Sequence, residues 1–264
     1  MSAAVHDPAA TSLAQGLLVS DVDSTFLTQE VIELVADHAG VRTQVEEITT
    51  AAMRGELDFS QSLRARVALL EGLDESVLAE VRAALVPTPG ALELMRRARE
   101  AGWVTALVSG GFHEVIDDLA AEAGIDHVRA NRFEIVEGRF TGRVSGPIID
   151  GTAKRRTLEE LAARHGVPTA RIVAMGDGAN DREMLVAAGT GIAFRAKPAL
   201  REIADVVLCA SGADDRVERQ RVLDQTVPDG QRAGEHRHRA GRHADPGLRG
   251  RARVGVVVGQ QRGE

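Results

Sequence analysis

The sequence is poor in aromatic residues and in cysteine, and each scarcity excludes a class of protein. Phe and Trp together make up only 3% of the 264 residues, and tyrosine is absent. A surface that stacks nucleic-acid bases on aromatic rings is therefore not expected. The net charge of −7 at pH 7 also argues against binding to a phosphate backbone. Cys209 is the single cysteine, so neither an intrachain disulfide nor a cysteine-rich zinc site can form.

Long apolar segments are missing as well. No run approaches the ~20 apolar residues that cross a bilayer, and the N-terminus lacks the basic and apolar regions of a signal peptide. The proportions of apolar residues (44%) and charged residues (27%) are ordinary for a soluble globular protein. We therefore expect a soluble, cytoplasmic protein with no membrane or nucleic-acid partner. The sequence leaves its oligomeric state open.

The chain does contain a regular alternation of short apolar runs and helical segments. This alternation is typical of a doubly wound, mostly parallel α/β sheet with helices on both faces. The expected strands are 17–20, 104–108, 127–130, 172–175, 190–194 and 206–209. The expected helices between them include 91–101, 113–123, 153–165 and 181–188.

Two segments interrupt the alternation. Residues 28–86 show only helical periodicity, which predicts a small helical cap inserted after the first strand. Residues 133–149 contain Glu-Gly at 137–138 and Thr-Gly at 141–142, which we interpret as turns in a small β-hairpin region.

The remaining parts of the chain define the expected core and its flanks. The core comprises 16–27 and 87–210, and residues 1–15 are expected to form a flexible arm. Residues 211–264 contain eleven arginines and no lysine, and they have almost no periodic apolar pattern. Such a composition buries too little apolar surface to offset the entropy of ordering, so we expect disorder. The small net positive charge of this segment argues against strong nucleic-acid binding.

Two aspartates follow the first apolar run in LLVSDVDSTF, at positions 17–26. Ligands of an open α/β sheet bind at the carboxyl ends of its strands, so Asp21 and Asp23 are expected at a ligand site. Two like charges held this close favour a cation, and oxygen ligands without Cys or His suit Mg²⁺. The alternative is a loop with solvated aspartates or a helix N-cap.

A second acidic motif, MGDGANDREML, follows the expected strand 172–175. Asp177 can complete the metal site, and Asn180 and Asp181 can orient substrate and neighbouring groups. A simpler interpretation of the same residues is an Asp-Gly turn followed by a capped helix.

Two more features suit an anionic ligand. In VSGGF, Ser109 ends a strand, and Gly110 frees the backbone so that amide groups can approach an anion at a helix start. Lys154 is one of only two lysines and lies in a first helical turn, where it opposes the helix dipole. A phosphate would give this lysine a partner. The simpler alternatives are a common Ser-Gly-Gly turn for the first motif and an ordinary surface lysine for the second.

In this order, DVDST, SGGF, Lys154 and GDGAND resemble the motifs of the haloacid dehalogenase superfamily of phosphohydrolases. The segment AGVRTQVEEITTAAMRGELDFSQSLRARVALLEGL, residues 39–73, resembles the cap of the phosphoserine phosphatase family within it. The resemblance covers residues 17–209. It implies a Mg²⁺-dependent phosphoric monoester hydrolase that converts O-phospho-L-serine to L-serine and phosphate in the last step of serine biosynthesis.

The resemblance also implies a role for each core residue. Asp21 attacks phosphorus to form an aspartyl-phosphate, and Asp23 protonates the leaving alkoxide and then activates water. The metal is held by the side chains of Asp21 and Asp177 and by the backbone carbonyl of Asp23. The residues implied to bind or orient the phosphoryl group are Ser109, Gly110, Lys154 and Asn180, with Asp181 in a supporting role.

Substrate choice is expected in the cap. Glu30 suits the ammonium of an amino-acid phosphate, and the planar fork of Arg66 suits its carboxylate. Met53 and Phe59 are expected to form an apolar wall that excludes water when the cap closes.

Two other functions remain open from the sequence. A related phosphatase for another small phosphomonoester would not need Glu30 and Arg66, since a sugar phosphate offers neither charge. An inactive phospho-ligand-binding module would have lost its nucleophile or metal ligands, yet Asp21, Asp23 and Asp177 are all present.

Overall fold

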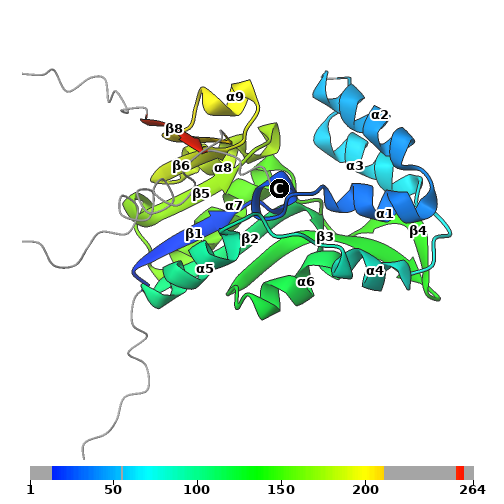
Figure 1. The fold of residues 1–264 in the computed structure, drawn as a ribbon, viewed down its shortest axis with the longest axis horizontal. Coiled ribbons are helices and arrows are strands. Elements are labelled where there is room, and N and C mark those ends of the chain that lie inside the picture. The colour runs from blue at the N-terminus through cyan, green and yellow to red at the C-terminus, as the bar shows by residue number, and fades with distance from the viewer. Residues whose placement is uncertain (1–13, 55, 211–253, 259–264) are drawn as a thin grey trace, which may run out of the picture.

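The computed structural model describes residues 14–54, 56–210 and 254–258 (Figure 1). The strands in these residues are β1 (Gly16–Ser20), β2 (Trp103–Phe112), β3 (His127–Val136), β4 (Arg139–Ser145), β5 (Ile172–Gly176), β6 (Thr190–Phe194), β7 (Val206–Ala210) and β8 (Val254–Val258). They form one sheet in the order β4-β3-β2-β1-β5-β6-β7-β8. Neighbouring strands are parallel except β3 and β4. The prediction of a mostly parallel α/β sheet is confirmed.

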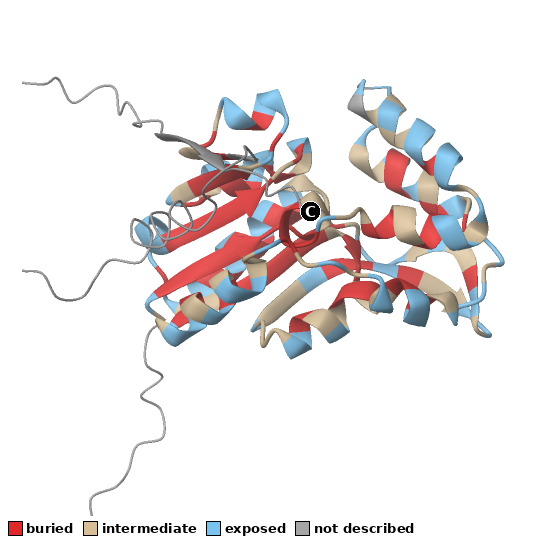
Figure 2. Ribbon diagram, viewed as in Figure 1, coloured by how far each residue is buried: buried red, intermediate tan, exposed pale blue. Residues whose placement is uncertain are grey.

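Helices cover both faces of this sheet, as the prediction of a doubly wound fold requires (Figure 1). Leu18 of β1 packs in the core with α5 (Ala91–Glu100) and α6 (His113–Glu122). Its neighbours Leu17 and Val19 pack in the opposite core, which is formed with α7 (Gly151–His165), α8 (Arg182–Ala187) and α9 (Pro198–Arg201). Burial on both faces explains why Leu17, Leu18 and Val19 are all apolar, and Figure 2 shows the central strands buried along their length.

The hairpin region differs from the prediction in two ways. The strand expected at 127–130 continues to Val136, so it is also the first strand of the hairpin. The turn lies at Glu137 and Gly138, but Gly142 lies inside β4 rather than in a second turn. Gly142 has a φ of 75°, and the register between β3 and β4 shifts beside it. Its Thr-Gly pair therefore marks a β-bulge, where glycine tolerates the left-handed conformation.

The described part of 28–86 is helical, as its periodicity indicates. It forms α1 (Val31–Ala39), α2 (Arg42–Met53), α3 (Phe59–Ala68) and α4 (Val77–Ala83). The two chain crossings between this cap and the core run side by side. The Thr28 amide donates to the Val86 carbonyl (3.0 Å), and the Thr88 amide donates to the Phe26 carbonyl (2.8 Å). In the described residues, no helix has the length and apolar content needed to span a membrane.

The cap rests on the β3–β4 hairpin, which the sequence did not connect with it (Figure 1). The Gly72 amide donates to the Phe140 carbonyl (2.8 Å), and the Phe140 amide donates to the Leu73 carbonyl (2.9 Å). Phe140 is buried against the same apolar core that includes Leu63 and Val67 of α3. The hairpin therefore supports the cap through these hydrogen bonds and apolar contacts.

The two flanking segments are described only in part. The prediction of disorder is wrong for Val254–Val258, which forms β8 beside β7, because this β-branched run pairs with the free strand edge. The rest of 211–264, and residues 1–13 of the predicted arm, lie outside the described residues. Gln15 is already attached to the core, since its amide donates to the Gly102 carbonyl (3.0 Å).

Candidate active site

The four polar motifs meet at the carboxyl edge of the sheet. Asp21 follows β1, Asp177 follows β5, and Ser109 lies near the end of β2, on the other side of β1. The first turn of α7 brings Lys154 to the same edge. The Asp21 amide donates to the Met175 carbonyl (2.8 Å), which continues the β1–β5 pairing by one residue. This bond fixes the first aspartate beside the second acidic motif.

A tight turn after β1 places Asp23 between the core and the cap. Ser24 has a φ of 56°, in the left-handed region, and this lets the chain reverse within Val22–Phe26. One carboxylate oxygen of Asp23 accepts from the Ser109 hydroxyl (3.1 Å). The other accepts from the backbone amide of Val31 at the start of α1 (2.6 Å).

The surroundings of Asp23 favour its protonated form. Burial, followed by the nearby charge of Glu30, raises its pKa to about 6, although the bonds from Val31 and Ser109 act in the opposite direction. A carboxyl group with this pKa holds a proton in part of the molecules near neutral pH. General acid catalysis requires such a group.

Lys154 is fully buried and donates to two carboxylates. Its ammonium contacts Asp21, and it lies 2.6 Å from the nearer oxygen of Asp181. Burial lowers the pKa of Lys154, but Asp181 and Asp21 together raise it above its ordinary value. The lysine is therefore charged and held against Asp21 at any physiological pH.

Asp181 organises the loop that carries Asp177. Its second oxygen accepts from the backbone amides of Asp177 (3.1 Å) and Gly178 (3.0 Å). A side chain at Gly176 would put its Cβ only 2.4 Å from the Asp181 carboxyl carbon, so this approach requires glycine. Both oxygens of Asp181 thus have partners within the protein, which suits the supporting role predicted for it.

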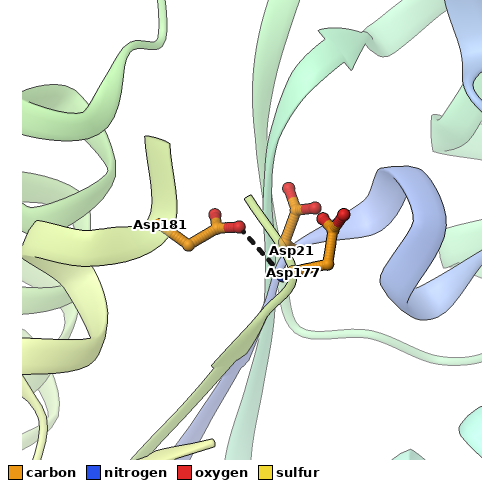
Figure 3. Close-up of side chains that lie close together, drawn as sticks. All are labelled: Asp21, Asp177 and Asp181. Atoms are coloured by element: carbon orange, nitrogen blue, oxygen red, sulfur yellow. Dashed lines mark hydrogen bonds between the residues drawn. The ribbon is translucent and has the colours of Figure 1, made fainter. Parts of the chain in front are cut away.

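The acidic side chains of Asp21, Asp177 and Asp181 lie around a common space (Figure 3). One carboxylate oxygen from each lies within 4.8 Å of the other two. Burial, followed by the charge of Asp181, raises the pKa of Asp21 well above its ordinary value and that of Asp177 to about 7. A divalent cation would relieve this repulsion. Hard carboxylate oxygens without nitrogen or sulfur ligands fit Mg²⁺.

The charged cap residues face this site. The carboxylate of Glu30 accepts from the Ser24 hydroxyl (2.7 Å). Arg66 is partly buried, and its Nε donates to the Ser62 carbonyl of its own helix (3.3 Å). Burial lowers the pKa of Arg66, whereas the charges of Glu30 and then Asp23 raise it. These influences mean that the guanidinium lies in the field of both carboxylates.

An apolar residue of the cap, Phe59, contacts the 109–111 segment of β2, which we call the Gly110 loop. A Cβ added to Gly110 would lie 2.8 Å from the tip of the Phe59 ring and 3.7 Å from the side-chain amide of Asn180. Phe59 therefore covers Gly110, and Asn180 lies beside Gly110. The roles of both residues toward a substrate stay predictions. Met53 is the last residue of α2, and its side chain is outside the described part of the structure.

Two polar residues at the site have no predicted role. Ser24 binds Glu30, and Asn131 of β3 binds the Gly110 carbonyl (2.8 Å) through its side-chain amide. A signal for Asn131 was available, because asparagine is uncommon inside a buried strand. It was missed because the expected strand ended one residue earlier.

Comparisons with known proteins agree with this geometry. The chain is 56% identical over 191 residues to the phosphoserine phosphatase of Streptomyces coelicolor, covering 72% of this chain and 47% of the relative. It is 50% identical over 190 residues to that of Streptococcus thermophilus, covering 72% and 88%. A solved phospho-aspartyl intermediate analogue of phosphoserine phosphatase matches with a TM-score of 0.70 at 40% identity, covering 74% of this chain and 93% of that chain.

The family model of haloacid dehalogenase-like hydrolases matches residues 18–186, which contain all four polar motifs. The chain is therefore a haloacid dehalogenase-like hydrolase. Within this class, the identities to the relatives above show that it belongs to the phosphoserine phosphatase family. It spans about half the length of its relatives from Streptomyces coelicolor and Mycobacterium tuberculosis.

Proposed function

We propose that this protein is a Mg²⁺-dependent phosphatase that hydrolyses O-phospho-L-serine to L-serine and phosphate, the last step of serine biosynthesis. The observation that carries the proposal is the arrangement around Asp21. Lys154 contacts this carboxylate. Asp23, two residues further along the chain, accepts a hydrogen bond from the Ser109 hydroxyl. A solved substrate-bound phosphoserine phosphatase complex, with a TM-score of 0.70 to this chain, supports the choice of substrate.

In the first step, a carboxylate oxygen of Asp21 attacks phosphorus while the bond between phosphorus and the serine oxygen breaks. The electron pair of the broken bond goes to the serine oxygen, which takes the proton of Asp23. The products are L-serine, an aspartyl-phosphate at Asp21 and an ionised Asp23.

In the second step, Asp23 acts as the base. It takes a proton from a water molecule, whose oxygen attacks phosphorus as the bond to the Asp21 oxygen breaks. Inorganic phosphate leaves, the Asp21 carboxylate is restored, and Asp23 is protonated for the next cycle. Splitting the reaction in this way replaces one very slow hydrolysis by two faster displacements.

Negative charge on the phosphoryl oxygens must be neutralised in both steps. In this proposal, Lys154, the Ser109 hydroxyl and the backbone amide of Gly110 donate hydrogen bonds to these oxygens. Mg²⁺, held by the carboxylates of Asp21 and Asp177 and by the carbonyl of Asp23, would supply further positive charge when bound. The side chain of Asp23 stays free of the metal in this assignment, so that it can transfer the proton.

The cap selects the amino-acid part of the substrate. Glu30 accepts the ammonium and Arg66 binds both carboxylate oxygens. Phe59 lies over Gly110 and would shield the site from bulk water. The same role is proposed for Met53 from the sequence alone.

The direct test is phosphate release from a panel of phosphomonoesters, with and without Mg²⁺. We expect phosphoserine to be the preferred ester, with activity lost on chelation and restored by Mg²⁺. Acid quenching during turnover should trap a phosphoryl group on Asp21. Equal rates on sugar phosphates and phosphoserine would point to a broader phosphatase, and no release from any ester would contradict the proposal.

A further inference from the structure

Asn131 is a buried amide whose two ends bind two different parts of the site. The residue is 1% exposed and lies in the middle of β3. Its side-chain nitrogen donates to the Gly110 carbonyl (2.8 Å), and its side-chain oxygen accepts from the Ile149 amide (2.9 Å). Asparagine is disfavoured in strands, so its presence in this buried position requires a specific reason.

The first of these bonds replaces a bond that the sheet lacks. Val108 of β2 pairs with Arg129 of β3, but the next pair along is Phe112 with Asn131. Four residue steps on β2 therefore correspond to two on β3, and the Ser-Gly-Gly segment bulges out of the ladder. Such a bulge leaves backbone groups unpaired. The Asn131 amide supplies the donor for the Gly110 carbonyl and so fixes the orientation of this peptide.

The second bond reaches the helix that carries Lys154. Ile149 directly precedes Asp150, the N-cap of α7, whose carboxylate accepts from the Ala153 amide (2.9 Å). Lys154 follows in the same turn and contacts Asp21. The start of α7 is thus held by its own cap and, through Ile149, by Asn131.

We propose that Asn131 is a positioning residue that sets the spacing between the Gly110 loop and the α7 turn bearing Lys154. The inference rests on the proposed function, in which these two groups bind the same phosphoryl group. To bind both the Gly110 carbonyl and the Ile149 amide, a residue needs a donor and an acceptor on one short planar side chain. Aspartate lacks the donor, leucine lacks both groups, and glutamine places both groups one methylene farther from the backbone.

The primary test compares Asn131→Asp with wild type in phosphoserine hydrolysis at saturating Mg²⁺. Aspartate keeps the acceptor for Ile149 but places a carboxylate oxygen against the Gly110 carbonyl. We expect kcat to fall about 10- to 100-fold, as expected for a small misplacement of a catalytic group. KM should rise less, because Glu30 and Arg66 still bind the serine portion. Asn131→Ser, which is smaller than the native residue, serves as a second variant if the aspartate variant does not fold.

Thr105→Val is the matched control for loss of a buried hydrogen bond. Thr105 is fully buried in β2, but its hydroxyl donates to Asp126 (2.9 Å) in the half of the strand away from Ser109. We expect this variant to lower Tm with kcat close to wild type. If Asn131 has only a structural role, the ratio of the loss in kcat to the loss in Tm should be the same for Asn131→Asp and Thr105→Val.

Calorimetric binding of inorganic phosphate in Mg²⁺ separates this inference from the proposed function. We expect the Asn131 variants to bind phosphate about 10-fold more weakly than wild type, because a displaced Gly110 amide would lose its hydrogen bond to the charged phosphate. An inactive wild-type protein would refute the proposed function, and the phosphate affinities would still test Asn131. Unchanged phosphate affinity together with unchanged kcat in the Asn131 variants would overturn the inference.

Discussion

The edge of the sheet and the cap hold their charged residues in different ways. At the edge, Lys154 is fully buried and already contacts Asp21 and Asp181 within the protein. In the cap, Glu30 and Arg66 are only partly buried, and neither forms an ion pair with another described residue. Groups that stabilise a transition state act best when they are fixed in advance. Groups that recognise a substrate can leave their strongest contacts to the substrate itself.

The largest expected effect is at the edge of the sheet. Asp21→Asn keeps the shape of the side chain but removes the attacking charge, so kcat should fall on the order of 10⁴-fold or more. The loss should be the same for phosphoserine and for a generic aryl phosphate, because both need the nucleophile. Steady-state kinetics on the two esters test this. Retention of near wild-type activity would refute the covalent mechanism.

A cap substitution should separate the two esters. Arg66→Ala removes a two-pronged contact worth roughly 2–4 kcal/mol in a desolvated site, equivalent to about a 30- to 1000-fold loss in kcat/KM for phosphoserine. The aryl phosphate should change little, because Asp21, Asp23 and Lys154 remain. Arg66→Lys should recover only part of the loss, since an ammonium cannot reproduce the planar fork.

Arg64→Ala is the matched control for the cap, because Arg64 lies on the same helix but is exposed. It should leave kcat/KM unchanged for both esters. Equal losses on both esters in Arg66→Ala would mean that Arg66 supports cap closure instead of recognising the carboxylate.

The contact between the two regions should have a smaller, measurable energy. Gly110→Ala places a methyl group 2.8 Å from the Phe59 ring, so the ring must shift and phosphoserine turnover should fall. Phe59→Ala removes the obstruction. A double-mutant cycle on kcat/KM should therefore give a coupling of about 0.5–3 kcal/mol, with the double variant better than the sum of the single losses. If the two free-energy changes from kcat/KM simply add, Phe59 and Gly110 are not in energetic contact.

The smallest expected effect lies far from both regions, where α7 ends beside the start of β3. The Nε2 atoms of His127 and His165 are 2.8 Å apart. Burial, followed by His165 and Arg164, lowers the pKa of His127, and the charge of Asp126 opposes this effect. Above pH 6.5 the group is neutral in both the folded and unfolded states. Below it the unfolded chain takes up the proton first, so the free energy of unfolding decreases until the folded-state pKa is passed.

Replacement of His127 by glutamine should therefore flatten the decrease of Tm below pH 6.5 without changing kcat for either ester. Thermal unfolding of both proteins above and below that pH measures the difference. An identical pH profile in the variant would show that His127 does not change its proton binding on folding.

The chemistry-bearing residues of the core were predictable because they follow directly from short apolar strands. Asp21 and Asp177 directly follow β1 and β5, and Ser109 lies near the end of β2, and parallel strands bring these ends to one edge. The assignment of Glu30 and Arg66 to substrate recognition remains a proposal, although the structure places both charges near Asp23. The role of Asn131 was not predictable, because an asparagine in a buried strand marks an unusual position but does not show which groups it binds.

By itself, the sequence determined the alternating α/β core, the inserted cap and the motifs at the strand ends, because these depend on periodicity and composition over a few neighbouring residues. Only the tertiary structure decided that the β3–β4 hairpin supports the cap, that Asn131 joins the Gly110 loop to α7, and that Val254–Val258 extends the sheet. The contact of Lys154 with Asp21 joins residues 133 positions apart. Such contacts depend on how complete elements pack and which backbone groups the packing leaves unpaired, and no local pattern in the sequence records either.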